Sequence, residues 1–271
     1  MKGLLKVYLP FAKGQIKEFM AYGINAYVYI FGNMLQTAVL LYIWKAVFDS
    51  SQQSSINGFT FNDMIFYVVM SMVTGMLVGN DVHWSVGQDV QTGDIAMNLI
   101  KPVNYQLRQY FGSLGYVFVN LVFIFLPMWS CLIGYTLFTG QSLPSISRLL
   151  LYFGSAFLSS MLMFAINYMF GLAAFYVEYI FGFIFAKEAL VRLLSGELIP
   201  LVFFPATVMG VFKYLPFAGI VYTPVMIYLG KYTGDQLIEA IIIQIIWVIF
   251  LMVMTQLLWN KAIKRLSILG G

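Results

Sequence analysis

Residues 80–110 read NDVHWSVGQDVQTGDIAMNLIKPVNYQLRQY and form the only long polar interval of the chain. Inside this interval the pattern predicts a short helix over about residues 93–100. Thr92 is the expected N-cap, and Asp94 in the first turn suits the positive end of the helix dipole. Pro102 is expected to end the helix, because proline disfavours helical geometry in the residue before it and has no backbone N–H.

The predicted helix presents Ile95, Asn98 and Leu99 on one face, since residues three and four apart are neighbours on a helix. A helix of about eight residues is not stable by itself in water. We therefore expect this helix to rest against a soluble partner protein, and the rest of the chain to move with it.

The composition is that of a membrane protein. Of 271 residues, 61% are hydrophobic and only 10% are charged, with a mean hydropathy of +0.85, whereas a globular protein carries about 25% charged residues. The net charge of +4 is too small and too scattered to indicate binding to nucleic acid. The single cysteine, Cys131, lies in an apolar stretch and is interpreted as a buried packing residue.

Several apolar runs are long enough to cross a bilayer, which predicts an all-α polytopic membrane fold in one domain spanning residues 1–271. Before the first span, residues 1–22 are predicted to form an interfacial helix with its lysines toward anionic headgroups; a frayed basic tail is the alternative. These lysines are Lys2, Lys6, Lys13 and Lys17. The six expected spans cover about residues 23–45, 61–80, 111–138, 148–175, 179–198 and 237–259.

Four prolines interrupt the apolar segment 199–235, which precedes the last predicted span. The run 201–212 is too short to cross a bilayer, so the segment is predicted to be a re-entrant hairpin at the outer face. The alternative is a seventh span broken by proline, which would place the two termini on opposite sides of the membrane.

The distribution of lysine and arginine orients the predicted spans, because cytoplasmic loops carry an excess of both. With six spans, nine of these residues lie on the side of the termini and of residues 80–110, and four lie on the other side. This difference places both termini and residues 80–110 in the cytoplasm.

The chain offers few groups for catalysis. His83 is its single histidine and has no neighbouring cysteine or histidine cluster, which argues against a metal or haem site. No phosphate-binding loop of the form G-x-x-x-x-G-K-[ST] occurs, so the chain is not expected to be an enzyme or to bind a cofactor itself. Any work driven by a nucleotide must then come from a partner chain.

The fifth predicted span contains three charged residues, Lys187, Glu188 and Arg192, among phenylalanines and leucines. Such charges are too costly to face lipid. Glu188 and Arg192 are four residues apart, in the orientation that favours an ion pair on a helix. Two interpretations remain open: the three residues line a translocation path, or they form an internal ion pair that holds this span against a neighbour. A secondary transporter driven by ions through this span is the alternative function.

Three segments resemble the permease subunit of a type II ABC exporter. Thr92-Gly93-Asp94-Ile95 through Leu99-Ile100-Lys101-Pro102-Val103 is similar to the loop "G-D-I…L-x-(K/R)-P" of that family. Leu194-Ser195-Gly196-Glu197-Leu198-Ile199-Pro200-Leu201, followed by Phe204-Pro205, is similar to its "S-G-x-x-x-P-L-x-x-F-P" segment. Leu215-Pro216-Phe217 and Tyr222-Thr223-Pro224 provide a third match, and the likeness covers essentially the whole chain.

The resemblance implies a permease that pairs with a second permease, identical or homologous, and with two separate ATPase subunits that bind ATP and magnesium. It implies that residues 80–110 are a coupling loop and that segment 199–235 is an outer gate. The expected location is the cytoplasmic membrane of a bacterial cell, and the apolar, aromatic-rich walls favour an amphipathic or hydrophobic cargo. The implied ATPase-coupling residues are Gly93, Asp94, Ile95, Asn98, Leu99, Lys101 and Pro102, and the implied gate residues are Gly196, Pro200, Pro205 and Pro216.

Overall fold

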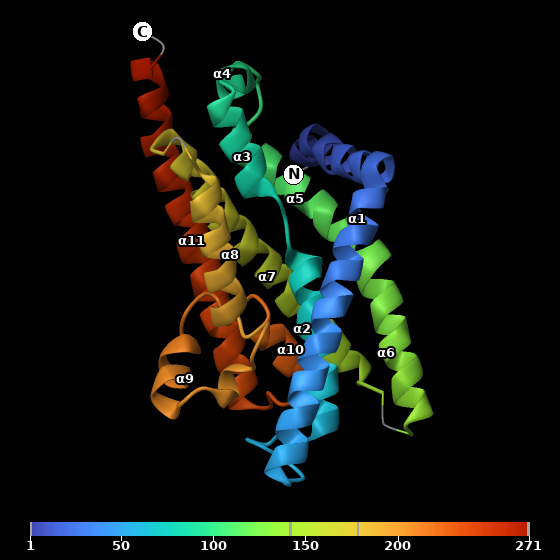
Figure 1. The fold of residues 1–271 in the computed structure, drawn as a ribbon. Coiled ribbons are helices and arrows are strands. Elements are labelled where there is room, and N and C mark those ends of the chain that lie inside the picture. Colours follow the sequence, from blue (N-terminus) through green and yellow to red (C-terminus); the bar gives the residue numbers. More distant parts are fainter. Residues whose placement is uncertain (1, 141–142, 178, 270–271) are drawn as a thin grey trace.

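A computed structural model describes residues 2–140, 143–177 and 179–269, and the side chains of residues 2–5, 22–26, 29 and 266–269 lie outside this description. Within these ranges the chain is built from helices and their connections, which confirms the all-α prediction (Figure 1). The α-helices are α1 Lys2–Ser51, α2 Phe61–Val78, α3 Val82–Gln91, α4 Asp94–Leu99, α5 Tyr105–Asn120, α6 Leu126–Phe138, α7 Ile146–Leu172, α8 Phe181–Leu194, α9 Ala206–Phe212, α10 Tyr222–Tyr228 and α11 Asp235–Leu269. A π-helical turn, Leu121–Phe125, joins α5 to α6, and Ala173–Phe175 and Leu201–Phe203 are 3-10 helices.

Five helical segments of the described chain are long and apolar enough to cross a membrane, so the chain is a multi-pass membrane protein. The predicted fifth span does not reach this length. α8 has 14 residues and ends at Leu194, which gives it a length of about 21 Å against a hydrocarbon core of about 30 Å. Gly196 follows with φ +76° in the left-handed region, where a helix cannot continue. The five segments are Ile30–Ser51, Phe61–Gln91, Tyr105–Phe138, Ile146–Phe175 and Asp235–Arg265.

The polar interval 80–110 contains the predicted short helix as α4 and, in addition, the helix α3 and the start of α5, which were not predicted. The second span is interrupted at residues 79–81 and resumes as α3 (Figure 1). Val82 and Val86 of α3 are buried, and the Cβ of Val86 is so close to α7 that a Cβ added to Gly171 would lie 2.8 Å from it. The valine pair four residues apart is therefore the apolar stripe that holds α3 in the bundle.

The interruption at residues 79–81 leaves backbone carbonyls without helical partners, and two asparagines supply them. Asn120 Nδ2 donates to the carbonyl of Met76 at 2.7 Å and to that of Gly79 at 3.5 Å. Asn167 Nδ2 donates to the carbonyl of Asn80 at 2.8 Å. Because a backbone carbonyl without a partner is costly away from water, these two side chains stabilise the interruption.

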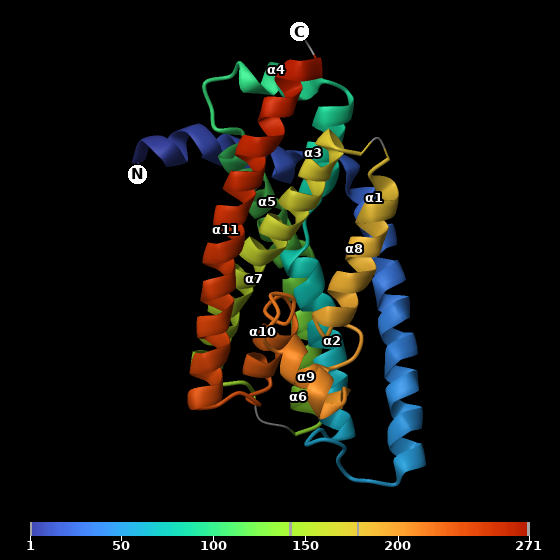
Figure 2. The same ribbon diagram turned by 90° about the vertical axis from the view of Figure 1, so that its left-hand side faces the viewer.

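Helix α1 has two limbs, and the predicted interfacial helix is the first of them rather than a separate element. The N-terminal limb crosses the end of the bundle where α4 and the C-terminus lie, and the second limb runs along the bundle (Figures 1 and 2). Lys6, Lys13 and Lys17 are exposed, whereas Tyr8 and Ala12 are buried; the side chain of Lys2 lies outside the description. The buried side of the limb packs on α5, through Tyr8 on Phe111 and Ala12 beside Gly115, and its location at a membrane surface stays a prediction.

Close contact between this limb and α5 depends on Gly115. A Cβ added there would lie 2.5 Å from the carbonyl oxygen and 3.0 Å from the Cα of Ala12, both backbone atoms that cannot rotate away. We expect Gly115→Val to separate the limb from α5 and to lower the free energy of unfolding by about 1–3 kcal/mol. The measurement is amide hydrogen exchange over residues 6–21. Gly134→Val in α6, where an added Cβ meets nothing within 4 Å, is the control and should leave that exchange unchanged.

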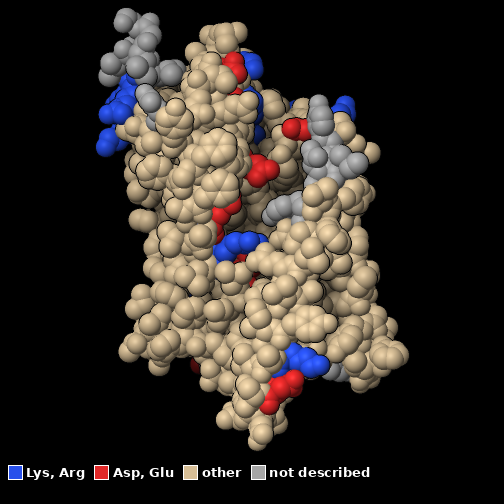
Figure 3. Space-filling view, in the orientation of Figure 1, with Lys and Arg blue, Asp and Glu red and all other residues tan. Residues whose placement is uncertain are grey.

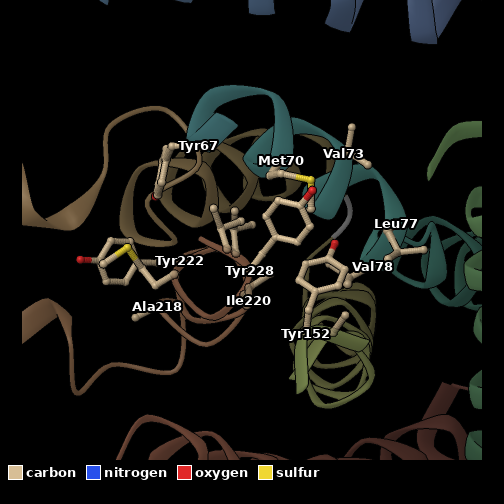
Figure 4. Close-up of a cluster of buried hydrophobic side chains, with 14 of the residues drawn as sticks. Tyr67, Met70, Val73, Leu77, Val78, Tyr152, Ala218, Ile220, Tyr222 and Tyr228 are labelled. Atoms are coloured by element: carbon tan, nitrogen blue, oxygen red, sulfur yellow. The ribbon is translucent and has the colours of Figure 1, made fainter. Parts of the chain in front are cut away.

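The largest group of buried apolar side chains lies where α2, α7 and α10 meet. Four tyrosines pack there with valine, leucine and methionine side chains (Figure 4). The hydroxyls of Tyr152 and Thr74 share a hydrogen bond of 2.8 Å, which satisfies both groups in the core. The four tyrosines are Tyr67, Tyr152, Tyr222 and Tyr228.

Segment 199–235 contains the 3-10 helix, α9 and α10, and neither α-helix has more than seven residues. α9 has no buried residue, whereas all seven residues of α10 are buried. α9 lies toward the end of the molecule opposite α4, and α10 lies inside the bundle (Figure 2).

Cys131, predicted to be buried, is exposed on α6, because the packed face of that helix contains Leu132 and Thr136 instead.

Candidate functional site

Helix α4 is held by its own chain. Ile95 has no exposed surface and packs in a cluster with Val86, Tyr105 and Trp259, from three other helices. Asn98 is also buried, and Leu99 is partly buried beside the same cluster. The face that sequence reasoning assigned to a partner protein is therefore turned inward, which corrects that expectation for Ile95 and Asn98.

A polar network fixes the same face of α4. Asn98 Nδ2 donates to Asp89 Oδ2 at 3.0 Å, and the hydroxyl of Tyr105 donates to the same oxygen at 2.7 Å. Lys101 Nζ and the guanidinium of Arg108 both donate to Asn98 Oδ1. Asn98 and Lys101, two of the predicted coupling residues, thus join α3, α4 and α5 into one unit.

The network continues to the N-terminal limb of α1. The hydroxyl of Tyr8 accepts a hydrogen bond of 2.9 Å from the backbone N–H of Asn104, and the ring of Tyr8 stacks on Phe111. The guanidinium of Arg108 lies 5.7 Å from the centre of the Phe11 ring. Sequence reasoning missed these contacts, because they join positions about 100 residues apart.

The outer face of α4 is exposed and apolar. Met97 is 62% exposed and Ile100 is 73% exposed, and their spacing of three residues places them side by side. The spacing of three residues between Met97 and Ile100 is the signal in the sequence for this face. The remaining predicted residues, Gly93, Asp94, Lys101 and Pro102, are exposed around the two.

The start of α4 differs from the prediction. Gly93, with φ +80°, precedes the first helical residue, and Thr92 ends α3 instead of capping α4. The hydroxyl of Thr92 donates to Asp94 Oδ2 at 2.7 Å. Only glycine adopts a positive φ at little cost, so Gly93 makes the sharp turn that separates the two helices.

A cavity of about 620 Å³ lies between α1, α2, α3, α5, α8 and the segment before α10. Its floor and walls combine apolar with polar and charged residues, and the space-filling view shows the hollow with acidic atoms along it and a basic patch at its lower end (Figure 3). Glu188 and Arg192, predicted from the sequence, both line it. The lining also includes Asp81, His83 and Trp84 of the polar interval.

Lys187 lies behind the cavity wall. It is 2% exposed, and its Nζ donates to Asn167 Oδ1 at 2.7 Å and lies 3.9 Å from Glu188 Oε1. Glu188 Oε1 also lies 3.5 Å from Nε2 of His83. The lysine is thus held inside the helical bundle.

Arg192 forms its ion pair with Glu197 and not with Glu188. Its Nε lies 3.0 Å from Glu197 Oε1, and its NH2 group donates to Asn33 Oδ1 of α1 at 3.3 Å. The carboxylate of Glu197 sits over α2, where a Cβ added to Gly75 would lie 3.1 Å from it. The predicted i,i+4 pair was wrong because the turn at Gly196 brings Glu197 back to the end of α8.

The predicted gate residues occupy different environments. The carbonyl of Gly196 accepts a hydrogen bond of 2.6 Å from Tyr67, and a Cβ there would lie 3.0 Å from that hydroxyl. Pro200 and Pro216 are buried, whereas Pro205 is exposed at the start of α9. Gly196 and the two buried prolines therefore fix the connection between α8 and α10, and their role as a gate stays a prediction.

Within the described residues, no group of three histidine, cysteine, aspartate or glutamate side chains is arranged to hold a metal ion.

Among curated proteins, none matches the chain. A family model described as "ABC-2 family transporter protein" matches residues 34–270. Membership of this family implies an ATPase partner. The exposed apolar pair Met97 and Ile100, at one end of the helical bundle, agrees with such a partner. The chain belongs to the ABC-2 family of transporter proteins, as a membrane-spanning permease subunit.

Proposed function

We propose that the chain is the membrane subunit of an ATP-driven exporter that moves an amphipathic or hydrophobic substrate out of the cell. In this proposal two separate ATPase subunits bind ATP and magnesium, and a second permease, identical or homologous, completes the transport path. Both termini and α4 face the cytoplasm.

The observation that carries the proposal is the division of α4 into two faces. Its inner face is buried with Ile95 and bonded through Asn98, and its outer face exposes Met97 and Ile100. An exposed apolar pair on a short, firmly held helix is suited to binding a groove on another protein, because well-packed apolar anchors contribute most of the energy of an interface.

Movement of α4 would reach the cavity through α3. α4 is bonded to α3 by the Asn98–Asp89 contact, and α3 begins at Val82, beside the cavity-lining residues Asn80 and Asp81. A displacement of α4 by nucleotide-dependent closure of the ATPases therefore moves part of the cavity wall. The mixed apolar and polar lining supports a substrate with both kinds of surface.

The test replaces the centre of the exposed face. Ile100→Asp places a charge where an apolar anchor is expected, and we expect the affinity for the ATPase to fall by about thirtyfold or more. The measurement is the ratio of ATPase to permease in complexes purified through an affinity tag on the permease, together with their ATP hydrolysis.

Ile146→Asp is the matched control, because Ile146 is 77% exposed at the start of α7, away from α4. This control should retain the ATPase and its activity. If Ile100→Asp retains as much ATPase as Ile146→Asp, α4 is not the contact and the proposal fails.

A further inference from the structure

The cavity contains more acidic than basic groups. Among its described lining residues, the carboxylates of Asp81, Glu188 and Glu197 stand against one guanidinium, that of Arg192. Arg192 and Glu197 neutralise each other at 3.0 Å. Glu188 has Lys187 at 3.9 Å, but that lysine lies behind the wall with its Nζ bonded to Asn167.

Asp81 is the carboxylate whose charge is least compensated. It precedes α3, yet its side chain forms no capping hydrogen bond, and it is exposed in the cavity lining. The like charges of Glu188 and Glu18 act on it, against the single opposite charge of Lys187. A carboxylate placed among like charges favours the arrival of a cation.

Aromatic side chains line the same cavity as Asp81. Trp84, in the first turn of α3, lines the cavity, and Tyr116 and Phe19 line it from α5 and α1. Aromatic faces attract cations, so these rings favour a cationic group of a ligand in the cavity.

We propose that this cavity is the cargo site and that it selects an amphipathic cation, whose charged centre binds between Asp81, Glu188 and Trp84. The apolar body lies against Met76, Ile124 and Val221, which line the same cavity. The volume of about 620 Å³ fits a drug-sized molecule. This inference rests on the proposed transport function, and it adds the charge of the substrate.

The test compares two probes of similar shape and opposite charge, tetraphenylphosphonium and tetraphenylborate. Their saturable binding to the purified full chain in uncharged phosphatidylcholine nanodiscs is measured against empty nanodiscs. We expect Asp81→Asn to weaken binding of the phosphonium by about tenfold and to strengthen binding of the borate. Glu188→Gln should likewise weaken binding of the phosphonium and strengthen binding of the borate. Asp81→Glu keeps the negative charge, so both affinities should stay close to those of the unchanged chain.

Asp49→Asn is the matched control, because Asp49 is exposed near the end of α1 and outside the cavity lining; it should change neither affinity. Opposite shifts for the two probes cannot arise from misfolding, which weakens both. Equal shifts for the two ions, or none with Asp81→Asn, overturn the inference. No ATPase is present in this assay, so its failure leaves the Ile100 test untouched, and failure of the Ile100 test leaves these affinities unchanged.

Discussion

Replacing Ile95 by aspartate is expected to detach α4 from the bundle while the transmembrane core stays folded. Ile95 has no exposed surface and lies against Val86 and Trp259. Burying an ionised carboxylate without a partner costs several kcal/mol, and loss of the isoleucine packing costs about 2–5 kcal/mol more. The charge reaches water only if α4 leaves its site, and the Asn98–Asp89 hydrogen bond of 3.0 Å is then lost as well.

Amide hydrogen exchange of the purified permease measures this detachment. We expect exchange over residues 94–104 to accelerate by more than about thirtyfold, since each 1.4 kcal/mol of lost local stability is a factor of ten. Exchange in α7 should be unchanged. Met97→Asp is the matched control, because it adds the same charge to the exposed face of the same helix. Equal protection in the two variants would show that Ile95 does not anchor α4.

Replacing Arg192 by methionine is expected to destabilise the cavity floor. Glu197 keeps only 16% of its side chain exposed and would be left beside Gly75 without its ion-pair partner. Removing one member of a buried pair costs about 3–5 kcal/mol. Since the Arg192 side chain is 36% exposed, the expected cost is about 1–3 kcal/mol.

A second substitution tests the cause of this loss. Glu197→Gln in the Arg192→Met background removes the unpaired charge and should recover part of the stability, giving a coupling energy of about 1 kcal/mol or more in thermal unfolding. The matched pair is Lys213–Glu239, also 3.0 Å long but exposed by 31% and 40%. Its coupling should be clearly weaker, because water and salt screen an exposed ion pair. Additive effects at Arg192 and Glu197 would show that the pair contributes no stability.

Hydropathy was sufficient to predict most of the fold. The fourth predicted span, 148–175, matches α7 and its 3-10 extension within two residues. The last helix was predicted too short, as 237–259, because its C-terminal end is polar yet remains helical to Leu269. α3 was missed for the same reason. Its two buried valines are too few to stand out among ten residues, and only packing on α7 makes their spacing meaningful.

The candidate site was harder to predict, because its partners come from distant segments. Lys187 and Arg192 were predicted to be kept from lipid, which stays a prediction, and they donate to Asn167 and Asn33, on α7 and α1. Local spacing favoured Glu188 as the partner of Arg192, whereas the turn at Gly196 made Glu197 the closer carboxylate. Short-range helix rules cannot include such a contact, since they assume that the helix continues.

The interruption at residues 79–81 divides one membrane span into two helices, α2 and α3, that meet at a flexion point between them. α3 has ten residues, so its far end lies about 15 Å from that flexion point. A rotation of about 10° there displaces the far end by about 3 Å, while α2 keeps its place in the core. In the proposed exporter, such a rotation turns a push on α4 into a tilt of the part of the cavity wall that α3 supplies, at His83 and Trp84.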